Sequence, residues 1–258
     1  MAYPFIKARY FTPGRSSPID VLVIHTMESP EGADTAENVA KWFAGPTSNK
    51  ASAHYCIDSN SIVQCVKDDD VAWHAPGANH DGLGFEHAGR AAQRGGEWGD
   101  DYSKAMLKLS AKLAAAKCKE YDIPAVWLYP ADLRAARRGI TSHANVSAAF
   151  RRSDHTDPGR GFPIQRYLRL VREQLGTPAP TDGKVLKDDP PTVREGDKGW
   201  LVKRIQRLLK AKGFDPGADD GVFGNRTEEA LKRFQREQDL EPDAVAGPLT
   251  WKALLAQD

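Results

Sequence analysis

Three side chains far apart in the chain have the types that a hydrolytic metal site requires: His25, His143 and Asp157. Taken singly, His25 at the end of the apolar run 21–24 is typical of a structural histidine, and Asp157-Pro158-Gly159 is typical of a turn. Together, two imidazoles and one carboxylate form the ligand set of a catalytic zinc site with an open fourth position. Such a site activates water near neutral pH. The sequence therefore predicts a Zn²⁺-dependent hydrolase.

Two further residues have the chemistry to assist such a metal. His155 precedes Asp157 by two positions, so an extended backbone directs both side chains the same way. Glu86 follows the glycines of a strand-like run at 82–85. A carboxylate in that place is ordinarily a solvated strand residue, but beside a metal it is a candidate general base. We therefore predict that Glu86 and His155 are catalytic.

A third group of residues has the chemistry of a binding rim. Trp73 and His74 lie in a loop-like segment and offer an aromatic platform and a hydrogen-bond donor. The alternative is a core position for Trp73 and a surface position for His74. Arg160 follows the Asp157 loop closely enough to contact a substrate carboxylate.

The elements that must position these residues are short strands mixed with helices. A buried strand is expected at 21–25, and a hairpin at 53–57 and 62–66 around the polar turn 58–61. Apolar residues at helical spacing predict helices at 35–43, 103–121 and 163–175. This mixture indicates an α/β catalytic domain, with a mixed central sheet flanked by helices.

A proline-rich segment predicts the domain boundary. Residues 177–190 contain mostly polar residues and prolines, which favour an extended spacer. The expected domains are thus 1–176 for catalysis and 191–258 for a small all-α unit of three helices, with the linker at 177–190 between them. Three apolar groups, around residues 201–209, 230–234 and 251–255, mark the helices of the tail.

Composition narrows the partners of the 258-residue chain. Its net charge of +1 gives no sign of nucleic-acid binding, and no apolar run approaches the ~18 residues that span a membrane. The start of the chain shows no secretory signal, so we expect synthesis in the cytoplasm. Cys56, Cys65 and Cys118 are expected to be reduced and buried. We expect a monomer.

The ordered set of motifs resembles the type-2 N-acetylmuramoyl-L-alanine amidases, zinc enzymes that share the fold of the peptidoglycan-recognition proteins. The matching pieces occur in family order between residues 17 and 175: Val23-Ile24-His25-Thr26, Ser52-Ala53-His54-Tyr55, Ile62-Val63-Gln64, Ala72-Trp73-His74-Ala75, Gly84-Phe85-Glu86, Ser142-His143 and Asp157-Pro158-Gly159.

The resemblance implies roles by position. His25, His143 and Asp157 match the zinc ligands, and Glu86 matches the acidic residue that activates the attacking water. His155 stands where the family carries a lysine or another polar residue near the carbonyl oxygen, so a histidine there departs from a lysine rule. The resemblance places His54, with Trp73 and His74, on the rim where the muramyl peptide would lie.

The tail resembles the small helical peptidoglycan-binding domain. The motifs that carry this likeness include Arg194-Glu195-Gly196-Asp197, Asp220-Gly221-Val222-Phe223-Gly224 and Gly247-Pro248-Leu249-Thr250-Trp251. The spacing of Asp215, Asp219 and Asp220 misses the alternating ligands of a calcium loop, so the Asp220 motif is expected to be a turn.

The expected activity is zinc-dependent hydrolysis of the bond between N-acetylmuramic acid and L-alanine in bacterial peptidoglycan, as in a phage endolysin. The resemblance thus implies synthesis in a host cytoplasm without a signal peptide and action on the cell wall after release. A bacterial autolysin exported by another route is an alternative origin. Two rival functions remain: a non-catalytic peptidoglycan-recognition protein, and a zinc peptidase that cuts within the stem peptide.

Overall fold

The computed structural model describes residues 3–46, 48–176 and 192–255, and it divides into two compact units at residues 179 and 180. The predicted linker at 177–190 lies outside the described residues. In the first unit the elements are β1 (Phe11–Thr12), β2 (Val21–Thr26), α1 (Thr35–Ala44), β3 (Tyr55–Ile57), β4 (Ile62–Gln64), β5 (Val71–Ala72), β6 (Gly82–His87), the 3₁₀ turn η1 (Glu97–Gly99), α2 (Asp101–Glu120), α3 (Pro130–Arg134), β7 (Gly139–Ser142), α4 (His143–Phe150) and α5 (Ile164–Gln174).

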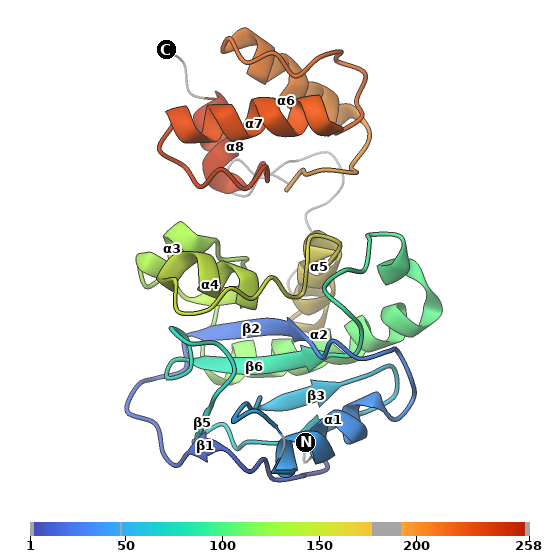
Figure 1. Ribbon diagram of the computed structural model, residues 1–258, viewed down its shortest axis with the longest axis vertical. Helices are drawn as coiled ribbons and strands as arrows, with labels where there is room; N and C mark the ends of the chain where they lie inside the picture. The colour runs from blue at the N-terminus through green and yellow to red at the C-terminus, as the bar shows by residue number, and fades with distance from the viewer. Residues whose placement is uncertain (1–2, 47, 177–191, 256–258) are drawn as a thin grey trace. The chain divides into compact units, whose positions relative to one another are not determined.

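A five-stranded mixed sheet organises the first unit. Its order is β4-β3-β6-β2-β7, with β3, β6, β2 and β7 parallel and β4 antiparallel to β3. Figure 1 shows the three central strands, β3, β6 and β2, side by side. The expected hairpin is confirmed: Asp58 Oδ1 accepts from the Asn60 and Ser61 amides at 3.0 and 2.8 Å, which fixes the turn between β3 and β4. The short strands β1 and β5 form a separate antiparallel pair.

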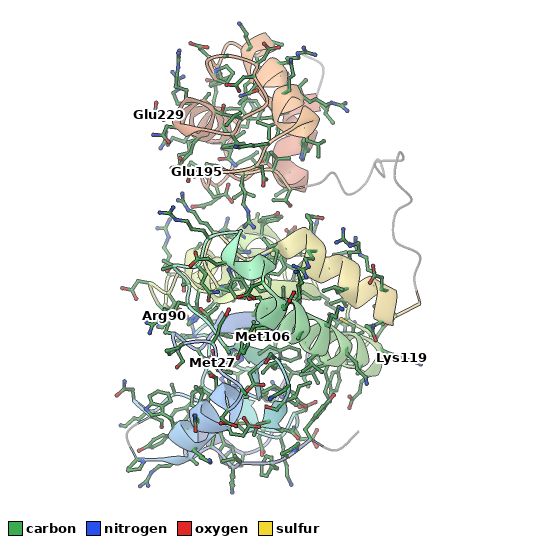
Figure 2. All side chains as sticks on the ribbon, turned by 90° about the vertical axis from the view of Figure 1, so that its right-hand side faces the viewer. Met27, Arg90, Met106, Lys119, Glu195 and Glu229 are labelled. Atoms are coloured by element: carbon green, nitrogen blue, oxygen red, sulfur yellow. The ribbon has the colours of Figure 1, made fainter. Side chains whose placement is uncertain are left out.

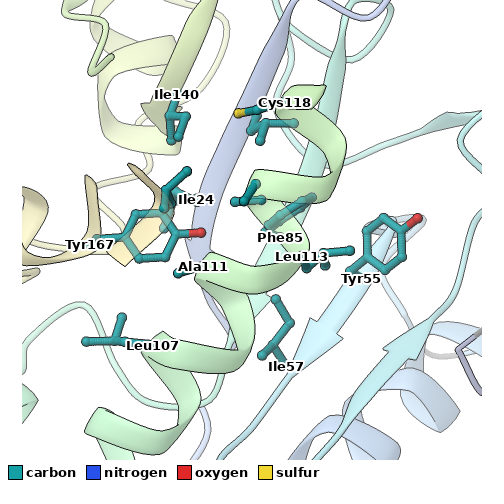
Figure 3. Packing of buried hydrophobic residues seen from close by; sticks show 14 of the residues in the cluster. Ile24, Tyr55, Ile57, Phe85, Leu107, Ala111, Leu113, Cys118, Ile140 and Tyr167 are labelled. Atoms are coloured by element: carbon teal, nitrogen blue, oxygen red, sulfur yellow. The ribbon is translucent and has the colours of Figure 1, made fainter. Parts of the chain in front are cut away.

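Alternation along the strands assigns each side chain to one face of this sheet. Leu22 and Ile24 of β2, with Leu83 and Phe85 of β6, belong to the core cluster that includes residues of α2 and α5. Figure 3 shows Ala111 of α2 and Tyr167 of α5 close to Ile24 and Phe85. The two helices lie side by side (Figure 2). Because neighbouring strand residues point to opposite faces, His25 and Glu86 point to the other face.

Helices α1 and α4 cover that other face in separate places. Ala36, Ala40 and Phe43 of α1 pack with the β3–β4 side of the sheet, while Val146 of α4 packs with Val21 and Val23. The predicted α/β architecture of this unit is confirmed, with helices on both faces of a mixed sheet.

The second unit contains α6 (Trp200–Ala211), α7 (Asn225–Glu237) and α8 (Pro248–Leu255), the three helices expected from the tail. They share a core built around Ile205, Phe234 and Leu254. The Asp220 motif is a turn, since Asp220 Oδ1 accepts from the Val222 amide at 2.9 Å just before α7 begins. In the described part of the chain, no helix combines the length and apolar character needed to cross a membrane.

Candidate metal centre and cavity

The carboxyl ends of three neighbouring parallel strands bring the predicted residues together. His25 on β2 is the register partner of Glu86 on β6, and Ser142, the last residue of β7, pairs with Ile24. His143 follows Ser142 directly and is the first residue of α4. Crevices at the carboxyl ends of parallel strands are the usual ligand sites of open α/β sheets.

Two local features fix His143 and Asp157. Ser142 caps α4 by accepting from the Asn145 amide at 3.2 Å, which sets the direction of the first helical turn. The Ala144 amide donates to the carbonyl of Asp157 at 2.9 Å, so the backbone of the downstream loop is tied to the same turn. The loop passes so close to Ala91 that only glycine fits at position 159, since a Cβ there would lie 1.8 Å from the Ala91 carbonyl oxygen.

His25, His143 and Asp157 are buried, and each offers a ligand atom within 4.8 Å of the other two. His25 Nδ1 lies 3.1 Å from Asp157 Oδ2, and His143 Nδ1 lies 3.2 Å from Asp157 Oδ1. Ligand atoms about 2.0–2.1 Å from a tetrahedral zinc lie roughly 3.3 Å apart. The donor set and its burial therefore fit zinc, and the three ligand atoms are close enough for small side-chain shifts to bring them around one ion.

The charges at this centre suit a cation. Burial alone would raise the pKa of Asp157, but hydrogen bonds with His143 and His25 outweigh it and hold that pKa below its ordinary value. Burial lowers the pKa of His25, against the opposing effect of Asp157. A carboxylate that stays ionised beside a neutral imidazole is the protonation state that metal binding needs.

Glu86 lies beside this centre in an unusual environment. Its Oε2 is buried and has no hydrogen-bond partner among the described residues. Burial, followed by the charge of Asp157, raises the pKa of Glu86 well above its ordinary value. A carboxyl group with a raised pKa can both take up and release a proton near neutral pH.

His155 lies at the exposed edge of the centre. Its side chain is 60% exposed, its Nδ1 is 3.4 Å from Asp157 Oδ1, and its ring stacks on His143 with centroids 4.2 Å apart. The structure therefore brings the two predicted catalytic residues and the three predicted ligands to one place.

All five of these residues line a cavity of about 610 Å³. The lining also includes three apolar residues of α1, namely Val39, Trp42 and Phe43. Trp73 and Pro76 line it as well. Trp73 is 37% exposed and its indole N–H donates to Thr12 Oγ1 at 3.0 Å, so this predicted rim residue does lie at the cavity.

Two other predicted rim residues, His54 and Arg160, do not line the cavity. His54 is wholly buried and does not line the cavity, so its expected place on the rim is corrected. The Gly84 amide donates to its Nδ1 at 3.0 Å, and Arg15 Nη2 lies 2.7 Å from its Nε2. These partners hold His54 beneath the surface, and burial, followed by the charge of Arg15, lowers its pKa to about 3. Arg160 is exposed and lies outside the cavity lining.

His74 lines the cavity but is only 7% exposed, which reverses the alternative of a buried Trp73 and a surface His74. Its Nδ1 lies 3.0 Å from His25 Nε2, a contact that the sequence did not predict. The signal that could have revealed it is Gly82-Leu83-Gly84. The two glycines lie on the same sheet face as His25 and leave room there for a neighbouring ring.

His87 supports the same centre from the opposite face. Its Nδ1 is 3.0 Å from the His25 carbonyl oxygen and its Nε2 is 2.6 Å from Ser110 Oγ, which in turn lies 2.8 Å from the Tyr167 hydroxyl. Burial lowers the pKa of His87 to about 4, so the ring is neutral at physiological pH.

Comparison with known proteins agrees with this geometry. A family profile described as N-acetylmuramoyl-L-alanine amidase matches residues 15–160, more than half of the chain, and one described as putative peptidoglycan binding domain matches residues 198–254. The chain belongs to the N-acetylmuramoyl-L-alanine amidase family and carries a peptidoglycan-binding domain. It is thus a peptidoglycan amidase, and its single chain folds into two compact units.

Individual relatives extend the likeness over most of the chain. N-acetylmuramoyl-L-alanine amidase A of Achromobacter lyticus is 29% identical over 188 residues, which cover 68% of this chain and 94% of that protein. A probable N-acetylmuramoyl-L-alanine amidase of Bacillus licheniformis is 27% identical across 98% of this chain and 72% of its own length. The crystal structure of Staphylococcus aureus hydrolase AmiA in complex with its ligand shares the fold, with a TM-score of 0.52, 18% identity and coverage of 70% of this chain and 88% of that one.

Proposed function

We propose that this amidase is zinc-dependent, with His25, His143 and Asp157 as the ligands, and that it cuts the bond between N-acetylmuramic acid and L-alanine. The observation that carries the proposal is the group of three buried ligand atoms within 4.8 Å of one another, next to Glu86 in one cavity. A bound zinc would polarise the scissile carbonyl and lower the pKa of a water.

The side chains of the chain supply the proton transfers. Glu86 accepts the proton of the attacking water and returns it to the departing amine, which its raised pKa favours. His155 donates a hydrogen bond toward the oxygen that gains negative charge in the transition state. Its place at the cavity edge, against His143, suits a group that meets the substrate from the solvent side.

The second unit would hold the enzyme on an insoluble polymer and take no part in the chemistry. It carries the match to the peptidoglycan-binding domain, and tethering through a short linker supplies effective concentrations of about mM. A catalytic unit joined to a wall-binding unit suits an endolysin. That role predicts lysis of cells that express the chain only after their cytoplasmic membrane is permeabilised.

Mass spectrometry of digested peptidoglycan tests the reaction. New L-alanine amino termini with intact glycan strands support the amidase, provided that a chelator stops the release and zinc restores it. Cuts between later residues of the stem peptide would instead assign a peptidase. No release by the zinc-loaded chain would leave a recognition protein, and the filled set of ligand positions argues against that outcome.

A further inference from the structure

We propose that His74 is a positioning residue that holds the ring of His25, so that Nδ1 of His25 faces the metal. The inference rests on the proposed zinc site and adds a residue to it. It replaces the expectation from sequence that His74 belongs to the substrate rim.

The contact between the two rings is direct. His74 Nδ1 lies 3.0 Å from His25 Nε2, and the rings meet edge-on at 85° with centroids 5.2 Å apart. The other nitrogen of His25, Nδ1, lies 3.1 Å from Asp157 Oδ2. A neutral imidazole that gives Nδ1 to a cation carries its proton on Nε2. That proton then points at Nδ1 of His74, which accepts it.

Strand β6 is shaped to receive the His74 ring. A Cβ at Gly84 would lie 2.7 Å from Cγ of His74 and 2.9 Å from its Nδ1, and a Cβ at Gly82 would lie 3.3 Å from Cε1. Real side chains essentially never come as near as the first two values. The ring therefore rests on the strand backbone because glycine occupies position 84, whereas at Gly82 the backbone oxygen of Ala78, at 2.3 Å, is what excludes a Cβ.

The backbone of His74 is fixed as well. Asn79 Oδ1 accepts from the amides of His74 and Ala75 at 3.0 and 2.7 Å, which closes the loop before β6. Nε2 of His74 is buried and has no hydrogen-bond partner among the described residues, so the ring makes its hydrogen bond through Nδ1. A partner that orients a metal-binding histidine is worth about 10–100-fold in metal affinity.

Two isosteric variants separate positioning from substrate contact. In His74→Asn the amide oxygen can occupy the place of Nδ1, whereas in His74→Gln the amide lies near the place of Nε2. Gly84→Ala leaves every hydrogen-bonding group intact and displaces only the ring. Zinc affinity is measured on the full chain without substrate, by competition with a chromophoric chelator, and thermal unfolding of each metal-free variant confirms that it folds.

We expect His74→Asn to bind zinc within about threefold of the unaltered chain, and His74→Gln and Gly84→Ala to bind it about 10–100-fold more weakly. Nitrogen-15 NMR of the zinc-loaded unaltered chain should find the proton of His25 on Nε2, a result that requires no variant. Equal zinc affinity in all four proteins, or a proton on Nδ1, would overturn the inference and leave the proposed zinc site standing. If the unaltered chain binds no zinc, the proposed function fails and the inference with it.

Discussion

Replacing Glu86 by glutamine should make the enzyme slower and the fold more stable at the same time. Glutamine keeps the shape of the side chain but cannot take a proton from water. A positioned general base contributes about 10²–10⁴-fold, so kcat should fall by that factor, which corresponds to about 3–5 kcal/mol of transition-state stabilisation.

The gain in stability follows from the burial of the same carboxylate. Because the folded-state pKa of Glu86 is raised, ionising it costs folding free energy at every pH above its unfolded-state pKa of about 4.3. The Gln variant removes that charge. Each unit by which folding raises a pKa costs about 1.4 kcal/mol once the group must ionise, whereas the Gln amide and a protonated Glu86 leave comparable buried polar groups. The variant should therefore gain at least about 1 kcal/mol at pH 7, and the gain should vanish below about pH 4.

The assay combines turnover of a soluble muropeptide with urea unfolding of the metal-free protein at both pH values. Glu229→Gln, the same chemical change at an exposed position of α7, is the matched control (Figure 2) and should alter stability by less than about 0.5 kcal/mol. Zinc content should be the same in all three proteins. A zinc-loaded Glu86→Gln enzyme with unchanged kcat, or one that is less stable at pH 7, would refute this reasoning.

Three further predictions follow from the structure. His155→Ala should lower kcat by about 10–10² while KM stays within about threefold, because its donor acts on developing charge from an exposed position; a rise in KM alone would make His155 a binding residue. Removal of residues 177–258 should lower activity on intact walls and spare small soluble muropeptides, and equal loss on both substrates would contradict a tethering role. The free energy of unfolding of the metal-free chain should fall as pH drops from about 6.5 to 4, because His87 then takes up a proton in the unfolded chain but stays neutral in the folded one. In urea unfolding, His87→Gln should reduce that loss by up to about 3 kcal/mol. An unchanged dependence of stability on pH would contradict the assignment.

The fold and the metal residues could be predicted from local patterns to different degrees. The apolar run at 21–24 predicted β2, and in the structure His25 points away from the core face that Ile24 occupies. The register that sets His25 opposite Glu86 joins strands far apart in the chain, so no local pattern encodes it. The helix that begins at His143 was also missed, since its eight residues lack a clear apolar face.

The rim shows where reasoning from motifs fails. Trp73 and His74 are adjacent, so a loop can expose either ring. The imidazole goes inward because Gly84 leaves room for it and His25 lies within hydrogen-bond distance. The motif around His54 does not reveal the burial of its ring either. Contacts with Arg15 and with the Gly84 amide hold this side chain in the interior. Such contacts depend on the three-dimensional arrangement of loops, which the spacing of residues does not reveal.

The central claim is that His25, His143 and Asp157 share one zinc ion, and anomalous diffraction from crystals of the zinc-loaded chain tests it most directly. We expect a single strong peak at the zinc absorption edge, within about 2.0–2.2 Å of Nδ1 of both histidines and of one Asp157 oxygen. An empty centre in zinc-loaded crystals, or a peak held by other residues, would contradict the account.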